Sequence, residues 1–504
     1  MIDSRFDADV AVVGYGPVGA TLAILLANRG RSVVVVERWP EPYPLPRAVH
    51  MDHEVARIFQ ACGLGPDLPA LTEAADIYEW RSGDGRTLLR LGRHGFGLCC
   101  WPQSMMFNQP ALEAALDRRA RAVGVDVRRA TEVIGLAPDP NGVTLHTADD
   151  KEIRARYVVG SDGANSTVRR LAGIQFHDLG FFFDWLIVDV ILHQPRAFDP
   201  INLQVCDPAR PTTAVSGGPG RRRWEFMRLP HETIEGLNSI ERAWELLEPW
   251  DVRPDNAVIE RHALYTFNAR YAERWRAERV LLAGDSAHQM PPFAGQGMCA
   301  GIRDAANLAW KLDLVLDESG YDGLLDTYEI ERRPEVCATI DFSMELGRVI
   351  CVPDPVEAEA RDEAMSAAVG QEPTEVPGLP PISEGLLDGS SQATGHLFPQ
   401  GLLDGGRFDD LHGAGWRLVT VVEEARLNPG TDGWFESIGG RTVTVPADHP
   451  VYGPWFAERG CVAALQRPDF HIYGTAHTWS GTEGLLSGLR TRLELSHESS
   501  GALS

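Results

Sequence analysis

Positive charge is scarce in this sequence. Its 504 residues include 47 lysines and arginines against 71 aspartates and glutamates, which gives a formal net charge of −24. Lys151 and Lys311 are its only lysines. An acidic surface of this kind is repelled by nucleic acids and by anionic membranes. We therefore expect neither a nucleic-acid partner nor a membrane partner.

Cysteines are also few, and their spacing indicates no metal or disulfide chemistry. The eight cysteines form no C-x-x-C pair and no Cys/His cluster, so the sequence predicts no metal site. The simplest interpretation is that these cysteines are reduced thiols, which predicts a cytoplasmic location.

A hydrophobic run long enough for a membrane anchor is missing as well. The best candidate, residues 8–30, reads ADVAVVGYGPVGATLAILLANRG and follows a segment with three aspartates. An export signal begins with basic residues instead. A spanning helix needs about 20 apolar residues without an early break, whereas three glycines and Pro17 interrupt the first half of this run. The pattern favours a strand, a glycine turn and a helix.

The glycines in this run have the G-x-G-x-x-G spacing of a dinucleotide-binding turn. Gly14 permits the tight turn, Gly16 lets the backbone approach a pyrophosphate, and Gly19 lets the helix pack close to the strand. The next strand, SVVVVE, ends at Glu37, whose carboxylate can accept the hydroxyl groups of an adenosine ribose. Strand, turn, helix and acid together predict a dinucleotide-binding fold.

Two later segments have the pattern of a flavin site. In YVVGSDGANSTVRRLAG, Asp162 and Gly163 follow an apolar strand, and Arg169 lies on the predicted helix that comes next. In VLLAGDSAHQMPPFAGQGMCAGIRDAANLAWKL, Gly284 and Asp285 end a strand before a loop of prolines and glycines leads into a helix. These segments turn the dinucleotide domain into a candidate flavin domain.

With these motifs in this order, the chain resembles the class A flavoprotein aromatic monooxygenases. The segments PRAVHMDHE, CDPARP, RRRWEFMRLP, LYTFNARYAERWR, RVLLAGDSAH and LLDTYEIERRPE are similar to the 3-(3-hydroxyphenyl)propionate hydroxylase branch. The resemblance covers about residues 8 to 345. Beyond them, the tail resembles the thioredoxin-like domain of many such enzymes but lacks a C-x-x-C pair.

The resemblance implies an α/β fold with three parts. We expect a Rossmann-like FAD-binding domain, an inserted and mostly antiparallel β-sheet domain for the substrate, and a C-terminal thioredoxin-like α/β module. The expected boundaries are 1–172 for the first part of the FAD domain, 173–270 for the substrate domain, 271–350 for the second part of the FAD domain, 351–395 for a linker and 396–504 for the module.

The resemblance also implies roles for single residues around FAD. Glu37 would bind the adenosine ribose, Arg47 and Gln109 the ribityl and phosphate region, and Asp285 a ribityl hydroxyl. Backbone N–H groups at the start of the late helix would face the pyrimidine oxygen, where reduced flavin carries negative charge. The implied cofactor-binding residues are Gly14, Gly16, Pro17, Gly19, Glu37, Arg38, Arg47, Gln109, Asp162, Gly284, Asp285, Pro292, Gly295, Gln296, Gly297 and Met298.

In the implied reaction, NADH or NADPH reduces FAD, dioxygen (O2) adds at the C4a atom, and the flavin hydroperoxide hydroxylates an electron-rich ring. The implied substrate is a small phenolic compound similar to 3-hydroxyphenylpropionate. The alternative is hydroxylation, epoxidation or Baeyer–Villiger oxidation of a larger polyketide-like aromatic. The choice between the two nicotinamide donors stays open, and so does the oligomeric state, with a homodimer as one alternative.

Hydroxylation of a phenol also needs a base that favours the phenolate. His288, Tyr265 and His262 are candidates for this base by their place in the motifs. Arg210 could hold a substrate carboxylate through a bidentate contact, and Arg47 completes the catalytic candidates. For each of these side chains the alternative is a structural role, as a satisfied core residue or as an arginine that stabilises a turn.

Two other functions are disfavoured. The sequence has no W-x-W-x-I-P stretch, which a flavin-dependent halogenase would be expected to carry. A flavin-binding regulator without turnover would share the fold, and steady oxidation of the nicotinamide cofactor that accelerates with a phenol would exclude it.

Overall fold

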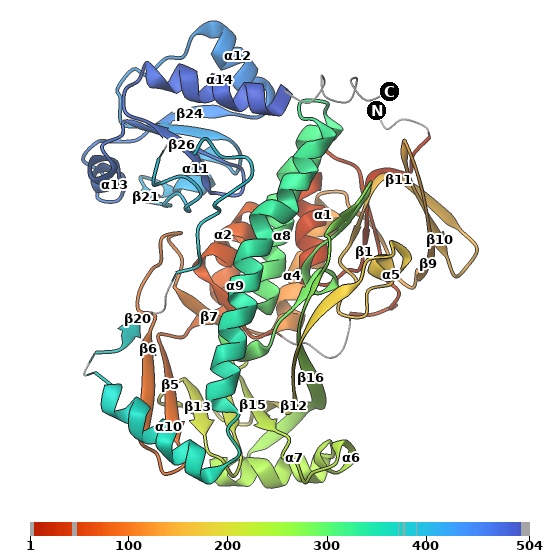
Figure 1. The fold of residues 1–504 in the computed structure, drawn as a ribbon, viewed down its shortest axis with the longest axis vertical. Coiled ribbons are helices and arrows are strands. Elements are labelled where there is room, and N and C mark those ends of the chain that lie inside the picture. Colours follow the sequence, from red (N-terminus) through yellow and green to blue (C-terminus); the bar gives the residue numbers. More distant parts are fainter. Residues whose placement is uncertain (1–4, 43–47, 371, 376–377, 390, 495–504) are drawn as a thin grey trace.

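The chain is organised by two large sheets, a smaller C-terminal sheet and two long central helices, α8 (Gly297–Leu316) and α9 (Asp326–Ile350) (Figure 1). This arrangement comes from a computed structural model, which describes residues 5–42, 48–370, 372–375, 378–389 and 391–494. Across these ranges, no helix combines the length and the apolar character that a membrane crossing requires.

The first sheet contains the predicted nucleotide-binding unit. Its central strands run parallel in the order β18, β11, β1, β2, β8. Buried parallel strands are continuously apolar, and the run of four valines in β2 fits this rule. Helix α1 (Pro17–Ala27) leads from β1 to β2 and packs against α8. The strands are β1 (Ala8–Val13), β2 (Val33–Val36), β8 (Asp126–Arg128), β9 (Val133–Asp139), β10 (Gly142–Thr147), β11 (Glu152–Gly160), β17 (Arg276–Ala277) and β18 (Val280–Leu282).

The second sheet has nine strands and is mostly antiparallel. The apolar segments DWLIVDVIL, TTAVS and RRRWEFM lie in its strands β12, β14 and β15. The sheet also takes β5 and β6 from the first predicted segment and β20 from the predicted linker. In sheet order the strands are β19 (His288–Gln289), β16 (Ala257–Ala272), β12 (Phe176–Leu192), β15 (Arg221–Met227), β14 (Thr212–Ser216), β13 (Asn202–Cys206), β5 (Ile77–Ser82), β6 (Thr87–Gly92) and β20 (Thr374–Glu375).

The pleat of this sheet separates two faces. On β12, Leu186 and Val188 pack beneath α7 (Ile240–Leu247) in one apolar cluster. Their neighbours Trp185 and Ile187 belong to a different cluster on the opposite face, together with residues that precede α8. Because successive side chains of a strand point to opposite faces, the sheet offers this second face to the nucleotide-binding side of the molecule.

The C-terminal part forms a separate four-stranded sheet in the order β24, β23, β25, β26. This part lies beside the upper ends of α8 and α9 in Figure 1. Its elements are α11 (Phe408–His412), β23 (Arg417–Thr420), α12 (Pro429–Ser437), β24 (Arg441–Thr444), α13 (Tyr452–Arg459), β25 (Ala463–Gln466), β26 (Ile472–Ala476) and α14 (Gly481–Glu494).

Shorter elements connect these units. A three-stranded sheet in the order β3, β7, β4 is built from strands that come between β2 and β8 in the sequence, and the predicted linker contains a full helix, α10. Asn108 caps α4, since its side-chain oxygen accepts a hydrogen bond from the backbone N–H of Ala111. These elements are β3 (His50–Asp52), α2 (His53–Ala61), β4 (Thr72–Ala74), β7 (Ser104–Phe107), α4 (Gln109–Ala122), α5 (Thr167–Leu171) and α10 (Pro355–Ala368).

A buried ion pair joins the C-terminal part to the rest of the chain and gives a first prediction. Arg57 on α2 contacts Asp409 on α11 at 2.5 Å, and their side chains are 0% and 3% exposed. Arg57→Ala would leave the Asp409 carboxylate buried without this partner, so we expect the free energy of unfolding to fall by about 3 to 5 kcal/mol. Urea-induced unfolding measures this loss.

The control is the exposed pair of Arg86 and Glu359. Because water screens exposed pairs, Arg86→Ala should lower the free energy of unfolding far less than Arg57→Ala does. If both variants lose the same free energy of unfolding, the buried Arg57 pair contributes no more to stability than the exposed pair, which would contradict the prediction.

Candidate functional site

A cavity of about 570 Å³ lies between the first sheet and the second face of the second sheet. The nucleotide side contributes the glycine turn, the end of β2 and the loop after β11. The opposite wall is formed by side chains of the second sheet, mainly Tyr78, Trp80, Ile187, Asn202, Thr213, Arg223, Glu225, Tyr265 and Phe267. The cavity is therefore built jointly by two sheets whose strands are far apart in the sequence.

The three positions of the turn require glycine for different structural reasons. Gly14 has a φ of +100°, and a Cβ there would lie 2.5 Å from the Ser161 carbonyl oxygen. A Cβ on Gly19 would lie 2.2 Å from the Gly14 carbonyl oxygen. A Cβ on Gly16 would meet nothing within 4 Å and would stand in the open cavity wall. Gly14 and Gly19 thus allow the chain to pack, whereas Gly16 keeps space clear for a ligand.

Glu37 and Arg38, both predicted to bind the cofactor, line the cavity at the end of β2. The Glu37 carboxylate accepts hydrogen bonds from the backbone N–H of Tyr15 at 2.9 Å and of Trp39 at 3.0 Å. It therefore braces the glycine turn while presenting its edge to the cavity. The Arg38 guanidinium lies over the Trp39 ring, 5.3 Å from its centroid.

Asp162 and Asp285 both line the cavity from loops that follow strands of the first sheet. Asp162 accepts hydrogen bonds from the backbone N–H of Thr167 at 2.7 Å and of Val168 at 3.1 Å, which caps the short helix α5. Burial raises the pKa of Asp162, although these hydrogen bonds oppose the shift. The backbone N–H of Gly284, beside Asp285, donates to Asp304 at 3.0 Å.

The segment that leads into α8 contributes four of its predicted cofactor-binding residues to the cavity wall. Pro292, Gly295, Gly297 and Met298 line the cavity, and Gly295 has a φ of +65°. Gln296 does not line it. Its amide bonds to Asp52 at 3.3 Å and to Arg303 at 3.0 Å on the other side of the loop.

Gln109 lines the cavity at the start of α4. Its side-chain oxygen accepts a hydrogen bond from the Ala48 N–H at 2.8 Å, and its nitrogen donates to Glu113 at 2.7 Å. Arg47, which was predicted to act beside it, lies outside the described residues.

Among the other catalytic candidates, only Tyr265 reaches the cavity. Its hydroxyl accepts a hydrogen bond from Arg261 at 2.9 Å, and its ring stacks on Phe267. His262 contacts Asn238 on the far side of β16 at 3.1 Å.

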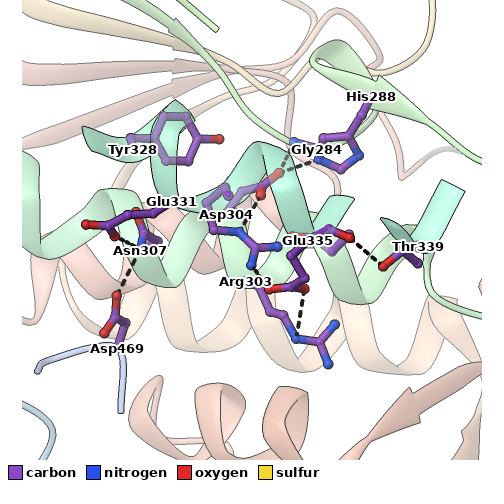
Figure 2. A network of polar contacts seen from close by, with 12 residues as sticks. Gly284, His288, Arg303, Asp304, Asn307, Tyr328, Glu331, Glu335, Thr339 and Asp469 are labelled. Carbon is purple, nitrogen blue, oxygen red and sulfur yellow. Dashed lines mark hydrogen bonds and ion pairs between the residues drawn. The ribbon is translucent and has the colours of Figure 1, made fainter. Parts of the chain in front are cut away.

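His288 and Arg210 are both committed to partners away from the cavity. The His288 side chain is fully buried, and its Nε2 lies 2.6 Å from Asp304, as Figure 2 shows. Arg210 makes a bidentate ion pair with Glu232 at 2.6 and 2.7 Å. This geometry favours the structural alternative for both residues, because neither side chain faces the space where a substrate would lie.

The structure adds a cavity residue that the sequence patterns did not indicate, His50. Its Nδ1 lies 3.2 Å from the Gly295 carbonyl oxygen, and its Nε2 lies 3.1 Å from the Ser104 hydroxyl and 2.9 Å from Arg93. A guanidinium can only donate, so Nε2 is the acceptor and Nδ1 carries the proton. Burial, aided by Arg93, lowers the pKa of His50 to about 4. His50 is thus a neutral bridge between the loop before α8 and Arg93.

Arg223 and Glu225 on β15 are the other charged residues on the sheet wall that were not predicted. Arg223 donates to Asp189 at 2.6 and 3.1 Å. Burial is the main cause that raises the pKa of Glu225, with a smaller contribution from Asp189, and Arg223 opposes it. The pair Arg223 and Asp189 and the buried acid Glu225 therefore stand among the aromatic side chains of the sheet wall.

Comparison with known proteins connects this geometry to flavin enzymes. Residues 7–343 match a family model described as an FAD binding domain. The chain is 39% identical over 511 residues to a probable NADH-specific resorcinol 4-hydroxylase of Rhodococcus jostii (strain RHA1), a match that covers 96% of this chain and 95% of the relative.

A second relative and a solved structure agree with this match. The chain is 39% identical over 373 residues to a 3-(3-hydroxy-phenyl)propionate/3-hydroxycinnamic acid hydroxylase of Mycobacterium sp. (strain JLS), which covers 72% of this chain but 64% of that protein. The flavin-dependent monooxygenase PieE, solved with FAD and substrate, shares the fold with a TM-score of 0.78 at 21% identity over 96% of this chain and 98% of that one.

The glycine turn yields a prediction that separates packing from FAD binding. In Gly16→Ala the added Cβ meets no protein atom, so the flavin-free protein should unfold at the same urea concentration as wild type while its affinity for FAD falls. In Gly19→Ala the Cβ collides with backbone, so the flavin-free protein itself should lose stability. Flavin fluorescence titration and urea unfolding measure the two quantities, and equal stability losses in both variants would contradict the distinction.

A further prediction concerns the pH dependence of stability. The pKa of His50 is about 4 in the folded chain and 6.5 in a model peptide, so the unfolded chain binds more protons between these values. Lowering the pH from 6.5 to 4 should therefore destabilise the fold through His50, by at most about 3 kcal/mol. In His50→Gln, urea unfolding of the flavin-free protein should show a smaller loss over this window, whereas identical pH dependence would contradict the assignment.

Proposed function

The chain belongs to the FAD-binding domain family and is an FAD-dependent aromatic monooxygenase, and on this premise we propose that it hydroxylates a small phenol with NADH and O2. The observation that carries the proposal is the shared cavity, in which the glycine turn and the aromatic sheet face open onto the same space. The substrate class follows the relatives, whose names specify resorcinol and 3-(3-hydroxyphenyl)propionate.

The residues on the nucleotide side fit FAD. Open space beside Gly16 at the amino terminus of α1 suits a pyrophosphate, because unpaired helix N–H groups attract anions. Glu37 would hold the ribose and Asp285 the ribityl chain. We place the isoalloxazine against Pro292–Met298, where the amino terminus of the 20-residue helix α8 favours the negative charge of the reduced ring. When bound, FAD supplies hydride acceptance and the activation of O2.

The sheet side would bind and shield the phenol. Trp80, Phe267 and Phe293 offer apolar surface on the cavity wall, which can cover an aromatic ring and keep water from the reacting atoms. Arg93 stands on the same wall, and in the described ranges no carboxylate pairs with it. Since His50 holds one end of its guanidinium, Arg93 is placed to attract a phenol oxygen that is losing its proton.

Anaerobic stopped-flow reduction tests this function directly. The purified protein with bound FAD is mixed with NADH or NADPH, with no phenol, with resorcinol or with 3-(3-hydroxyphenyl)propionate. We expect NADH to reduce the flavin faster than NADPH does, and one phenol to accelerate the reduction at least about tenfold, because substrate control of reduction prevents wasted NADH.

The control phenol is a polycyclic one. Reduction that no phenol accelerates would refute the proposal, and acceleration by the polycyclic phenol alone would replace the small substrate with a larger aromatic. Under aerobic conditions, the accelerating phenol should also yield a product with one additional oxygen by mass spectrometry.

A further inference from the structure

The wall of the cavity contains a carboxylate, that of Glu225, to which no described residue donates a hydrogen bond. Glu225 lies in the middle of β15, directly opposite Thr213 on β14 and Ile187 on β12. All three side chains line the cavity. Across-strand neighbours on one face of a sheet share the same surroundings, so Glu225 is held toward the cavity by the register of three strands.

Within the described chain, no donor lies within hydrogen-bond distance of the Glu225 carboxylate. The cation nearest to it is Arg223, whose Nη1 is 3.8 Å from the carboxylate, too far for a hydrogen bond. The Nε and Nη2 atoms of Arg223 already donate to Asp189. The Glu225 side chain is nevertheless only 12% exposed.

No donor among the described residues replaces the hydration that this largely buried carboxylate loses, so its hydrogen-bond donors must come from whatever fills the cavity. Such a group in a cavity wall points to a ligand that supplies the missing donor. A hydroxyl does so, whereas a substrate carboxylate at the same place would bring two negative charges together. The titratable groups that act on Glu225 from the neighbouring strands are Arg223 on its own strand, Asp189 on β12 and Arg261 on β16.

We propose that Glu225 accepts the proton of the substrate hydroxyl and is the base that the reaction needs. This inference rests on the proposed function, since it assumes that a phenol occupies the cavity. The phenolic O–H bond breaks, an O–H bond forms on the Glu225 carboxylate, and the electron pair stays on the phenolate oxygen. After hydroxylation the carboxylic acid returns this proton to the phenolate oxygen of the product, so Glu225 ends each cycle unchanged.

The surroundings of Glu225 suit this role. Burial, as the main cause, raises the pKa of its carboxyl group, which brings it closer to the pKa of a phenol and makes the transfer less uphill. The charges of Glu225 and Arg93 both act on the pKa of Tyr78, which Glu225 raises and Arg93 lowers. The acid and the cation therefore lie near the same part of the wall. A phenol there has a proton acceptor in Glu225 and a stabilising charge in Arg93.

The test compares Glu225→Gln with wild type. Gln keeps the size of the side chain and removes the basic oxygen. With resorcinol at neutral pH, kcat/KM should fall about 100-fold or more. The loss should shrink as the pH rises toward the pKa of resorcinol, because phenolate then forms in solution. A structural role of Glu225 would give no such recovery.

A binding measurement separates this result from activity. The probe is 4-nitrophenol, whose ionised form absorbs differently from its neutral form, and its difference spectrum on the FAD-loaded protein reports the ionisation of the bound phenol. Wild type should bind it as the phenolate at a pH where free 4-nitrophenol is still partly neutral. Glu225→Gln should bind the neutral form, and Glu225→Asp should restore part of the phenolate signal.

The matched control is Glu79→Gln. Glu79 lies on β5 of the same sheet with a side chain that is 9% exposed, but it pairs with Arg81 and does not line the cavity. This variant should behave as wild type in both assays. Unchanged phenolate binding and kcat/KM in Glu225→Gln would overturn the inference, and failure of wild type to bind any phenol would instead overturn the proposed function.

Discussion

A single buried carboxylate, Asp304 in the middle of α8, connects the units that enclose the cavity. Its Oδ2 accepts from the Gly284 N–H at 3.0 Å and contacts His288 Nε2 at 2.6 Å, and its Oδ1 accepts from Arg332 on α9 at 3.0 Å (Figure 2). Although burial opposes ionisation, His288 and Arg332 lower the pKa of Asp304. Since a buried charge without its partners is strongly destabilising, these three contacts fix the loop of the first sheet, the edge of the second sheet and α9 relative to one another.

The same two helices carry a second buried network toward the C-terminal part. Glu331 on α9 contacts Lys311 on α8 at 2.8 Å and also Arg467, while Asn307 on α8 donates to both Glu331 and Asp469. Burial lowers the pKa of Lys311 to about 8, against the pull of Glu331. Asn307 thus connects α8 to the C-terminal part, and Asp304 connects α8 to the loops around the cavity. The position of α8 depends on both sets of contacts.

The nucleotide side of the candidate site can be located from the sequence because its residues lie close together in the chain. Gly14, Gly16 and Glu37 lie within one strand, turn, helix and strand, so their spacing alone indicates a shared loop edge, and all three line the cavity. The substrate side depends on strand pairing. Strands β5 and β6 are separated by more than a hundred residues from β13, beside which β5 lies, and no local pattern predicts that neighbour. In β15, RRRWEFM, alternate side chains point to opposite faces of the sheet. This alternation places Glu225 in the cavity only once it is known which face of β15 lines the cavity.

The position of His288 away from the cavity also depends on strand pairing. His288 follows Asp285 by three residues, which suggests proximity to the flavin. The two-residue strand β19 nevertheless pairs with β16 and turns the imidazole toward α8. Adjacency in a motif does not determine which way a side chain points when the next residues join another sheet.

This division between the two walls has a chemical consequence. The nucleotide wall depends on backbone: glycines without side chains, helix amino termini and carboxylates that brace N–H groups such as those of Tyr15 and Trp39. The opposite wall depends on side chains that stand on a rigid sheet, where Thr213, Glu225 and Ile187 keep their places through ladder hydrogen bonds that do not involve those side chains. Substitutions on this second wall can therefore change the recognised phenol without disturbing the cradle for FAD. In such an arrangement, the choice of substrate depends mainly on the few polar groups of the sheet wall, because the apolar surface around them discriminates between similar rings only weakly.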